Sequence, residues 1–146
     1  MSRVRLYKQH PAAKLPTYAT EGSACVDLYS RSPVWIEPGT IAVVDTGICV
    51  ILEPDWCMQI LSKSGLASKG IYVLNAPGII DSDYRASIKV IVHNVSDRPY
   101  QILQGDKIAQ GMITPVYEFD YEELTSEQFY ADVTARGEGG LGSTGR

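Results

Sequence analysis

Ile71-Tyr72-Val73-Leu74 is a short apolar run, and Asn75-Ala76-Pro77-Gly78 stops it with a turn signal before the polar stretch Asp81-Ser82-Asp83-Tyr84-Arg85. β-Branched residues favour strands, whereas Pro and Gly favour turns. Similar short runs recur along the chain, in Val4–Tyr7, Val26–Tyr29, Ile41–Val44, Ile48–Leu52, Met58–Leu61, Ile88–Val92, Ile102–Leu103, Ile108–Ile113 and Val116–Phe119. Many short strands with frequent turns are typical of an all-β sandwich or barrel.

Helical signals are confined to two segments. Ser64–Lys69 predicts one short helix, for which Ser64 is a suitable N-cap. Thr125–Val133 carries a weaker helical pattern. We therefore expect an all-β fold with one short helix.

Composition indicates one domain. The chain has 146 residues, of which 45% are hydrophobic, and this is enough for a sizeable core. The formal net charge of −4 argues against duplex nucleic-acid binding, although it leaves room for a local basic pocket that holds a nucleotide.

The cysteines and the N-terminus indicate the cellular setting. Cys25, Cys49 and Cys57 lie in apolar segments without a C-x-x-C pattern, which indicates reduced thiols. With only His10 and His93, a structural zinc site is not expected. No apolar run has the character of a signal peptide or the length of a membrane span. We expect a soluble intracellular protein of the cytoplasm, or of the nucleus for a eukaryotic or viral source.

The chain divides into three parts by composition. Residues 1–119 carry the strand-like runs and predict a single β domain. Residues 120–135 are acidic and polar, and we interpret them as a tether that crosses the surface. Residues 136–146 form a glycine-rich C-terminal arm.

The arm, Arg136-Gly137-Glu138-Gly139-Gly140-Leu141-Gly142-Ser143-Thr144-Gly145-Arg146, suits a polyphosphate ligand. Glycine lets backbone N–H groups approach phosphate oxygens closely, while Ser143, Thr144 and Arg136 offer hydroxyls and charge. A frayed terminus is the alternative.

Two familiar glycine motifs do not account for this arm. Gly137, Gly139 and Gly142 match G-x-G-x-x-G, but a dinucleotide fold needs a preceding strand and a following helix. A Walker loop needs a lysine before the Ser/Thr. If the arm binds phosphate, it closes over a site built elsewhere, in its own chain or in a neighbouring one.

Three internal segments offer charge and donors for an anion. Asp27 interrupts an apolar strand, so its carboxylate either points inward and needs a partner or is exposed on the other face. Ser64 and Gly65 lie where a helix start presents free N–H groups, with Lys63 beside them. The turn into a strand explains Gly105 and Asp106, but it does not explain the polar Gln110 within the apolar run that follows.

A fourth segment offers groups for a base and a sugar. The amide of Asn75 both donates and accepts, which suits a planar base edge. Asp81 follows two apolar residues, and such surroundings hold a carboxylate and tune its pKa for general-base catalysis. Tyr84 offers an aromatic face for a sugar or base, or is a cross-strand packing partner.

In this order the segments closely resemble the five motifs of the trimeric dUTPase family, the deoxyuridine triphosphate nucleotidohydrolases. The matching segments are Ala24–Ser30, Ser62–Lys69, Asn75–Arg85, Gly105–Gln110 and Arg136–Gly145. The resemblance implies a jelly-roll-like β fold and a homotrimer with shared active sites. It also implies Mg²⁺-assisted hydrolysis of dUTP to dUMP and pyrophosphate, which limits uracil incorporation into DNA and supplies dUMP for dTMP synthesis.

The resemblance also implies roles for single residues. Asp81 corresponds to the base that activates water for attack at the α-phosphorus. Asn75 corresponds to the uracil-contacting residue, and Tyr84 to the tyrosine under the deoxyribose. Asp27 corresponds to an aspartate near the metal–water network, with no direct metal ligand expected from the protein.

For the phosphates, the resemblance implies contacts from two regions. Ser64, Gly65 and Gln110 correspond to phosphate-contacting positions, and Lys63 supports them. The arm covers the β- and γ-phosphates through residues that correspond to Arg136, Ser143 and Thr144, and Leu141 and Gly142 are further substrate-binding residues of the same arm.

Three residues depart from the family pattern. Lys63 stands in place of an arginine and lacks its planar bidentate fork. Ala86 stands in place of a glycine. Leu141 replaces the aromatic residue that lies over uracil, which weakens stacking by about 1 kcal/mol. Because the base and the hydroxyls remain, we expect an active enzyme with weaker arm closure.

Two other functions fit parts of the pattern. A dCTP deaminase-like enzyme has a related structure, and the base-reading segment and the intact arm argue against it. A nucleotide-sensing regulatory binding protein would not need Asp81.

Overall fold

The protein, described by a computed structural model for residues 3–141 and 145, is built mainly of short β-strands. These are β1 (Arg5–Lys8), β2 (Thr17–Tyr18), β3 (Val26–Tyr29), β4 (Val34–Ile36), β5 (Ile41–Asp45), β6 (Ile48–Ile51), β7 (Trp56–Leu61), β8 (Ile71–Val73), β9 (Gly78–Ile80), β10 (Lys89–Asn94), β11 (Tyr100–Ile102) and β12 (Lys107–Pro115). The two helices are α1 (Ser64–Ala67) and α2 (Ser126–Ala131).

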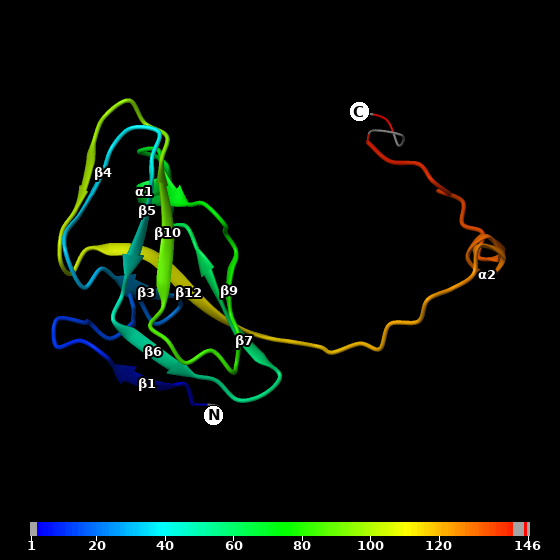
Figure 1. Ribbon diagram of the computed structural model, residues 1–146, viewed down its shortest axis with the longest axis horizontal. Helices are drawn as coiled ribbons and strands as arrows, with labels where there is room; N and C mark the ends of the chain where they lie inside the picture. Colours follow the sequence, from blue (N-terminus) through cyan, green and yellow to red (C-terminus); the bar gives the residue numbers. More distant parts are fainter. Residues whose placement is uncertain (1–2, 142–144, 146) are drawn as a thin grey trace.

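The strands form four antiparallel sheets (Figure 1). The largest has the order β2-β3-β12-β7-β9, so that β12 lies at its centre, and a second has the order β5-β10-β8. The pairs β1-β6 and β11-β4 complete the domain. Among the described residues no sheet closes on itself, and the all-β, jelly-roll-like fold expected from the sequence is confirmed.

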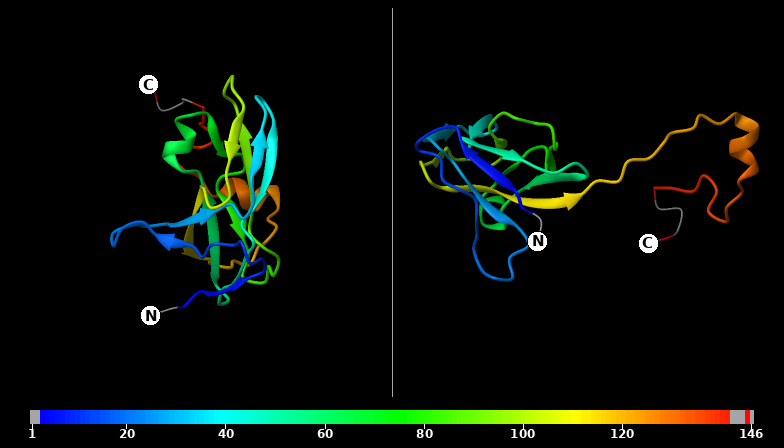
Figure 2. Two further views of the ribbon diagram at one scale, coloured as in Figure 1. Left: turned by 90° about the vertical axis from the view of Figure 1, so that its left-hand side faces the viewer. Right: turned by 90° about the horizontal axis from the view of Figure 1, so that it is seen from below.

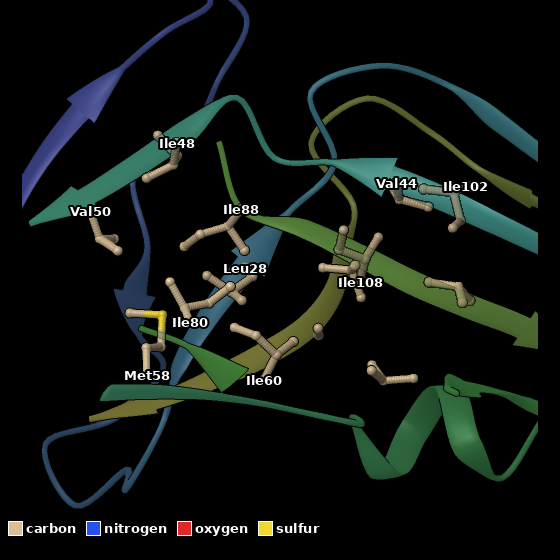
Figure 3. Packing of buried hydrophobic residues seen from close by; sticks show 14 of the residues in the cluster. Leu28, Val44, Ile48, Val50, Met58, Ile60, Ile80, Ile88, Ile102 and Ile108 are labelled. Carbon is tan, nitrogen blue, oxygen red and sulfur yellow. The ribbon is translucent and has the colours of Figure 1, made fainter. Parts of the chain in front are cut away.

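One apolar core fills the space between the sheets (Figure 3). Leu28, Met58 and Ile60 come from the five-stranded sheet and face Val44 and Ile88 from the other side of the core. Each is less than 3% exposed. Because alternate residues of a strand point to opposite faces, the polar residues between these core positions reach the other face of the sheet.

The chain leaves the sheets at the end of β12, and residues 116–135, which include the tether, extend away from them (Figures 1 and 2). The tether contains α2, at the weaker of the two helical signals. The Thr125 side chain accepts from the backbone N–H of Gln128, and the Gln128 side chain accepts from the N–H of Thr125, which is a capping box. The expected single helix is therefore joined by a second one.

Candidate functional site

Three of the polar segments meet on one face of the five-stranded sheet. Gln110 of β12 lies opposite Asp27 of β3 on one side and opposite Leu61 of β7 on the other. Directly opposed residues of antiparallel strands project to the same face. Gln110 Nε2 also donates to the carbonyl oxygen of Ser62, at 2.9 Å. The central strand thus brings Asp27 and Gln110 beside the segment that begins α1.

Asp27 is a buried carboxylate between two ammonium groups. It is 3% exposed. Lys63 Nζ donates to its Oδ1, and Lys107 Nζ lies 2.7 Å from its Oδ2. The second contact is an ion pair without the alignment of a hydrogen bond, since Oδ2 has no hydrogen-bond partner among the described residues. Asp27 therefore points inward and has the partners that a buried charge requires.

Lys107 reaches this cluster through a β-bulge. In the pairing with β3, Lys107 lies opposite Tyr29, but Ala109 lies opposite Leu28, so Ile108 is an extra residue. A bulge of this kind re-aims side chains. It turns Lys107 to the face that carries Asp27 and Gln110. The sequence predicted a turn into a strand here and did not single out Lys107, because a bulge leaves no clear sequence signal.

The Asp27 cluster makes stability depend on acid pH. Burial raises the pKa of Asp27, but the interactions with Lys107 and Lys63 more than offset this, so the pKa lies below the ordinary 3.8. A lowered folded-state pKa gives stability that is present above the unfolded pKa and is lost as pH falls through the folded one.

We expect wild type to lose stability more steeply than Asp27→Asn as the pH falls from about 5 to about 2. Urea unfolding followed by tryptophan fluorescence at several pH values measures this. Parallel stability curves for the two proteins would contradict the ion-pair assignment.

The start of α1 differs from the expectation that Ser64 caps it. Lys63 is the N-cap residue, and its side chain makes no capping hydrogen bond. Ser64 occupies the first helical position, where the N–H has no partner within the helix. A Cβ added to Gly65 would meet no atom within 4 Å. Packing therefore does not require glycine here, whereas close approach of a ligand would.

Asn75 lines a small cleft between the two main sheets. The cleft is formed by β7, β8, β9 and β10, and residues from each strand line it beside Asn75. A Cβ on Gly78 would lie 3.1 Å from Asn75 Nδ2, so this glycine makes room for the amide. The amide therefore lies beside Gly78 at a cleft whose lining includes Ile60, Val90 and the polar Lys89.

Asp81 and Tyr84 lie in the loop that follows β9. Both are exposed, and the Tyr84 N–H donates to the Asp81 carbonyl oxygen at 3.2 Å. The Tyr84 hydroxyl donates to the carbonyl oxygen of Ser87 at 3.3 Å. The apolar surroundings expected for the Asp81 carboxylate are thus wrong for the single chain, because Ile80 points into the core while Asp81 points out.

Asp81 does not join the cluster of Asp27, Lys63 and Gln110. The register of β9 on β7 pairs Gly78 with Ile60 and Ile80 with Met58. Asp81 therefore lies past Met58, at the end of β7 opposite to α1. The rise of roughly 3.3 Å per strand residue puts Asp81 on the order of 15–20 Å from Ser64.

The C-terminal arm is described only in part. Arg136 is exposed, and its Nε donates to the carbonyl oxygen of Gly139 at 2.8 Å. Leu141 is fully exposed with a φ of 46°. Gly142, Ser143 and Thr144 lie outside the described residues. The described part of the arm stands apart from the sheets (Figure 1).

The described residues include no group of three or more His, Cys, Asp or Glu side chains placed to hold a metal ion. Over residues 3–141 and 145, neither helix has the length and apolar character needed to cross a membrane. Cys25, Cys49 and Cys57 are free thiols.

Comparison with known proteins matches both the sequence and the fold. The family model dUTPase matches residues 12–145. A deoxyuridine 5'-triphosphate nucleotidohydrolase of Helicobacter pylori (strain Shi470) is 43% identical over 144 residues, 98% of this chain and 97% of the relative. The enzyme of the same name from Wolbachia pipientis subsp. Culex pipiens is 48% identical over 135 residues, 90% of this chain and 87% of the relative.

Solved structures agree on the architecture. A mutant of the Staphylococcus bacteriophage 80alpha dUTPase, solved with dUpNHpp, has a TM-score of 0.89 at 22% identity, covering 100% of both chains. A mutant of the dUTPase from phage phi11 of S. aureus, in which a structural Mg(II) ion is coordinated, has a TM-score of 0.78 at 22% identity, covering 84% of this chain and 96% of that one.

The fold is that of a jelly-roll-like β domain with a polar cluster on its central strand. The chain belongs to the dUTPase family and is an enzyme of that family.

Proposed function

We propose that this protein hydrolyses dUTP to dUMP and pyrophosphate by attack of water at the α-phosphorus. The observation that carries the proposal is the exposed Asp81 carboxylate. Asp81 directly follows β9, which lines the same cleft as Asn75. A base for water must be accessible, and Asp81 is. Family membership over nearly the full chain supports the same reaction.

The groups of the Asn75–Tyr84 segment fit the nucleoside and the reacting water. Asn75 donates to and accepts from the uracil edge, and Tyr84 packs against deoxyribose. Asp81 takes a proton from the attacking water, which typically contributes about 10²–10⁴-fold in rate. A positioned base and fixed donors are what phosphoryl chemistry needs, without a covalent nucleophile.

The second cluster fits the phosphates. Ser64 and Gly65 present a hydroxyl and N–H groups at the start of α1, and Gln110 lies beside them through its bond to Ser62. Lys63 adds positive charge next to this segment. Arg136, Leu141, Gly142, Ser143 and Thr144 belong to the arm that covers the nucleotide.

Mg²⁺ fits this site as an ion held by phosphate oxygens and water. Asp27 is the buried carboxylate beside residues 62–65, the segment that binds phosphate in this proposal (the phosphate segment). Two ammonium groups already neutralise it. It is therefore a neighbour of the ion and not a direct ligand. When bound, Mg²⁺ neutralises charge on the phosphate oxygens.

In our proposal each active site is shared between chains. Within one chain, the residues for uracil, for the attacking water and for the phosphates do not follow the order of these groups along dUTP. The backbone N–H of Val73, two residues before Asn75, donates to Ser62 Oγ at 2.9 Å. Asn75 is thus near the phosphate segment of its own chain, while Asp81 lies farther away. Along dUTP the order is uracil, sugar and then phosphates. The phosphate segment that serves Asn75 and Asp81 therefore comes from a second chain.

The tether supports delivery of the arm to a neighbouring chain. Tyr117, Phe119 and Tyr121 lie at alternate positions where the chain passes from β12 into the tether, and all three are exposed. Large apolar side chains that are exposed close together mark an interaction surface. A homotrimer would provide the partner for this surface and would bring the arm to another subunit's site.

The product and the substrate define the cellular consequence of this reaction. Removal of dUTP limits uracil incorporation into DNA, and dUMP is the precursor for dTMP synthesis.

A panel of nucleotides tests the proposal. Purified protein is incubated with Mg²⁺ and each dNTP, and pyrophosphate and ammonia are measured. Pyrophosphate from dUTP alone is the expected result. Ammonia from dCTP without pyrophosphate from dUTP would identify a deaminase, and binding of dUTP without turnover would identify a nucleotide sensor.

Leu141→Phe is expected to strengthen arm closure. An aromatic ring over uracil adds stacking of about 1 kcal/mol, which corresponds to a KM for dUTP lower by roughly fivefold. Leu141→Met keeps a flexible apolar side chain and serves as the control. Steady-state kinetics of the three proteins measure the effect, and an unchanged KM in the Phe variant would argue against contact between residue 141 and the base.

A further inference from the structure

We infer that Lys107 is a positioning residue for nucleotide binding: it keeps the buried Asp27 carboxylate paired while Lys63 turns to the phosphates. This inference rests on the proposed function, in which the segment beginning α1 binds phosphate. It assigns Lys107 a role that acts through Asp27 and Lys63 without a contact to the substrate.

The charge balance of the cluster is the first observation. Asp27 carries one negative charge and is 3% exposed, whereas two ammonium groups contact its two oxygens. One cation is sufficient to neutralise a buried carboxylate. The cluster therefore has one positive charge in excess at the place where phosphate is proposed to bind.

The positions of the two lysines show which one serves the phosphate. Lys63 is the N-cap residue of α1 and directly precedes Ser64 and Gly65; its side chain is 26% exposed and that of Lys107 is 48% exposed, so position and not exposure distinguishes the two lysines. Lys107 comes from the bulge at the start of β12, on a different element. Lys63 is thus the cation that a phosphate on the α1 segment attracts first, and Lys107 is the cation that stays with Asp27.

The cost of an unpaired carboxylate explains why two lysines are present. If Asp27 had Lys63 alone, attraction of Lys63 to phosphate would leave a buried charge without a partner, which is strongly unfavourable. With Lys107 on the second oxygen, Asp27 remains neutralised. Lys107 thereby lowers the energetic cost of nucleotide binding.

A double-mutant experiment tests this role. Lys107→Met, Lys107→Arg and the control Lys8→Met, which removes an exposed lysine of β1, are made in the wild-type and Asp27→Asn backgrounds. The KM and kcat for dUTP are measured with the Kd for the non-hydrolysable analogue dUpNHpp. Circular dichroism monitors folding, and Lys107→Gln replaces the Met variant if that variant does not fold.

In the wild-type background we expect Lys107→Met to raise the KM and the analogue Kd by about tenfold or more, with kcat unchanged. Lys107→Arg should restore binding. In the Asp27→Asn background Lys107→Met should have no effect, because no carboxylate is left to be unpaired. Lys8→Met should change nothing.

Two results would overturn the inference. An equal loss of binding in both backgrounds would show that Lys107 contacts the nucleotide directly, and no loss in the wild-type background would show that Asp27 needs no second cation. Wild-type protein that turns over no dUTP and binds no analogue would overturn the proposed function itself.

Discussion

Asp81→Asn should lower kcat for dUTP by about 10²–10⁴-fold, because the amide cannot take a proton from the attacking water. The KM and the Kd for dUpNHpp should stay close to their wild-type values. Asp81 is exposed in the loop after β9, so the replacement removes no core contact and should leave the fold intact. Pyrophosphate release under saturating dUTP measures the loss.

Asp83→Asn is the matched control for this variant. Asp83 is an exposed carboxylate two residues away in the same loop, and it has no assigned role in the reaction. A kcat near the wild-type value is expected for it. Equal loss in both variants would indicate a general effect of loop charge, and full activity of Asp81→Asn would exclude Asp81 as the base.

Removal of the arm after Ala135 should lower kcat/KM by at least about 10²-fold, since several donors to the phosphates are lost together. The described part of the arm stands apart from the sheets and contributes nothing to the apolar core. Circular dichroism and thermal unfolding should therefore match those of the full chain. A truncated protein with full activity would refute the role of the arm.

Mixing two inactive variants tests whether the arm closes over the active site that contains Asp81 of its own chain or over that of another chain. The truncated chain retains Asp81, and full-length Asp81→Asn retains the arm. After mixed refolding, shared sites can combine Asp81 of one chain with the arm of another, so activity should reappear. Mixtures that stay inactive although they form mixed oligomers would show that the arm serves the site of its own Asp81.

The all-β fold and the candidate site residues could be predicted from the sequence for a physical reason. Short β-branched runs and Pro/Gly turns act locally, so they predict strands without knowledge of their partners. The same holds for the weaker helical pattern of Thr125–Val133, where the structure has α2. The resemblance that rests on Asn75–Arg85 and the arm identified the family.

Other features depended on which strands became neighbours. The pairing of β12 with β3 and β7 brought Gln110, Asp27 and Ser62 together across long stretches of sequence. The same register separated Asp81 from the α1 segment. Hydrophobic patterning indicates which face of a strand is buried, but it does not specify the strand beside it.

Lys107 shows this limit most sharply. Its residue type and its turn-to-strand position were plain in the sequence, yet its contact with Asp27 depends on a single extra residue in β12. The sequence by itself determined which segments form strands, which segment forms the glycine-rich arm, and which side chains are available for the site. Strand pairing and the bulge placed the charges, because such contacts join residues far apart in the chain and arise only when the sheet has formed.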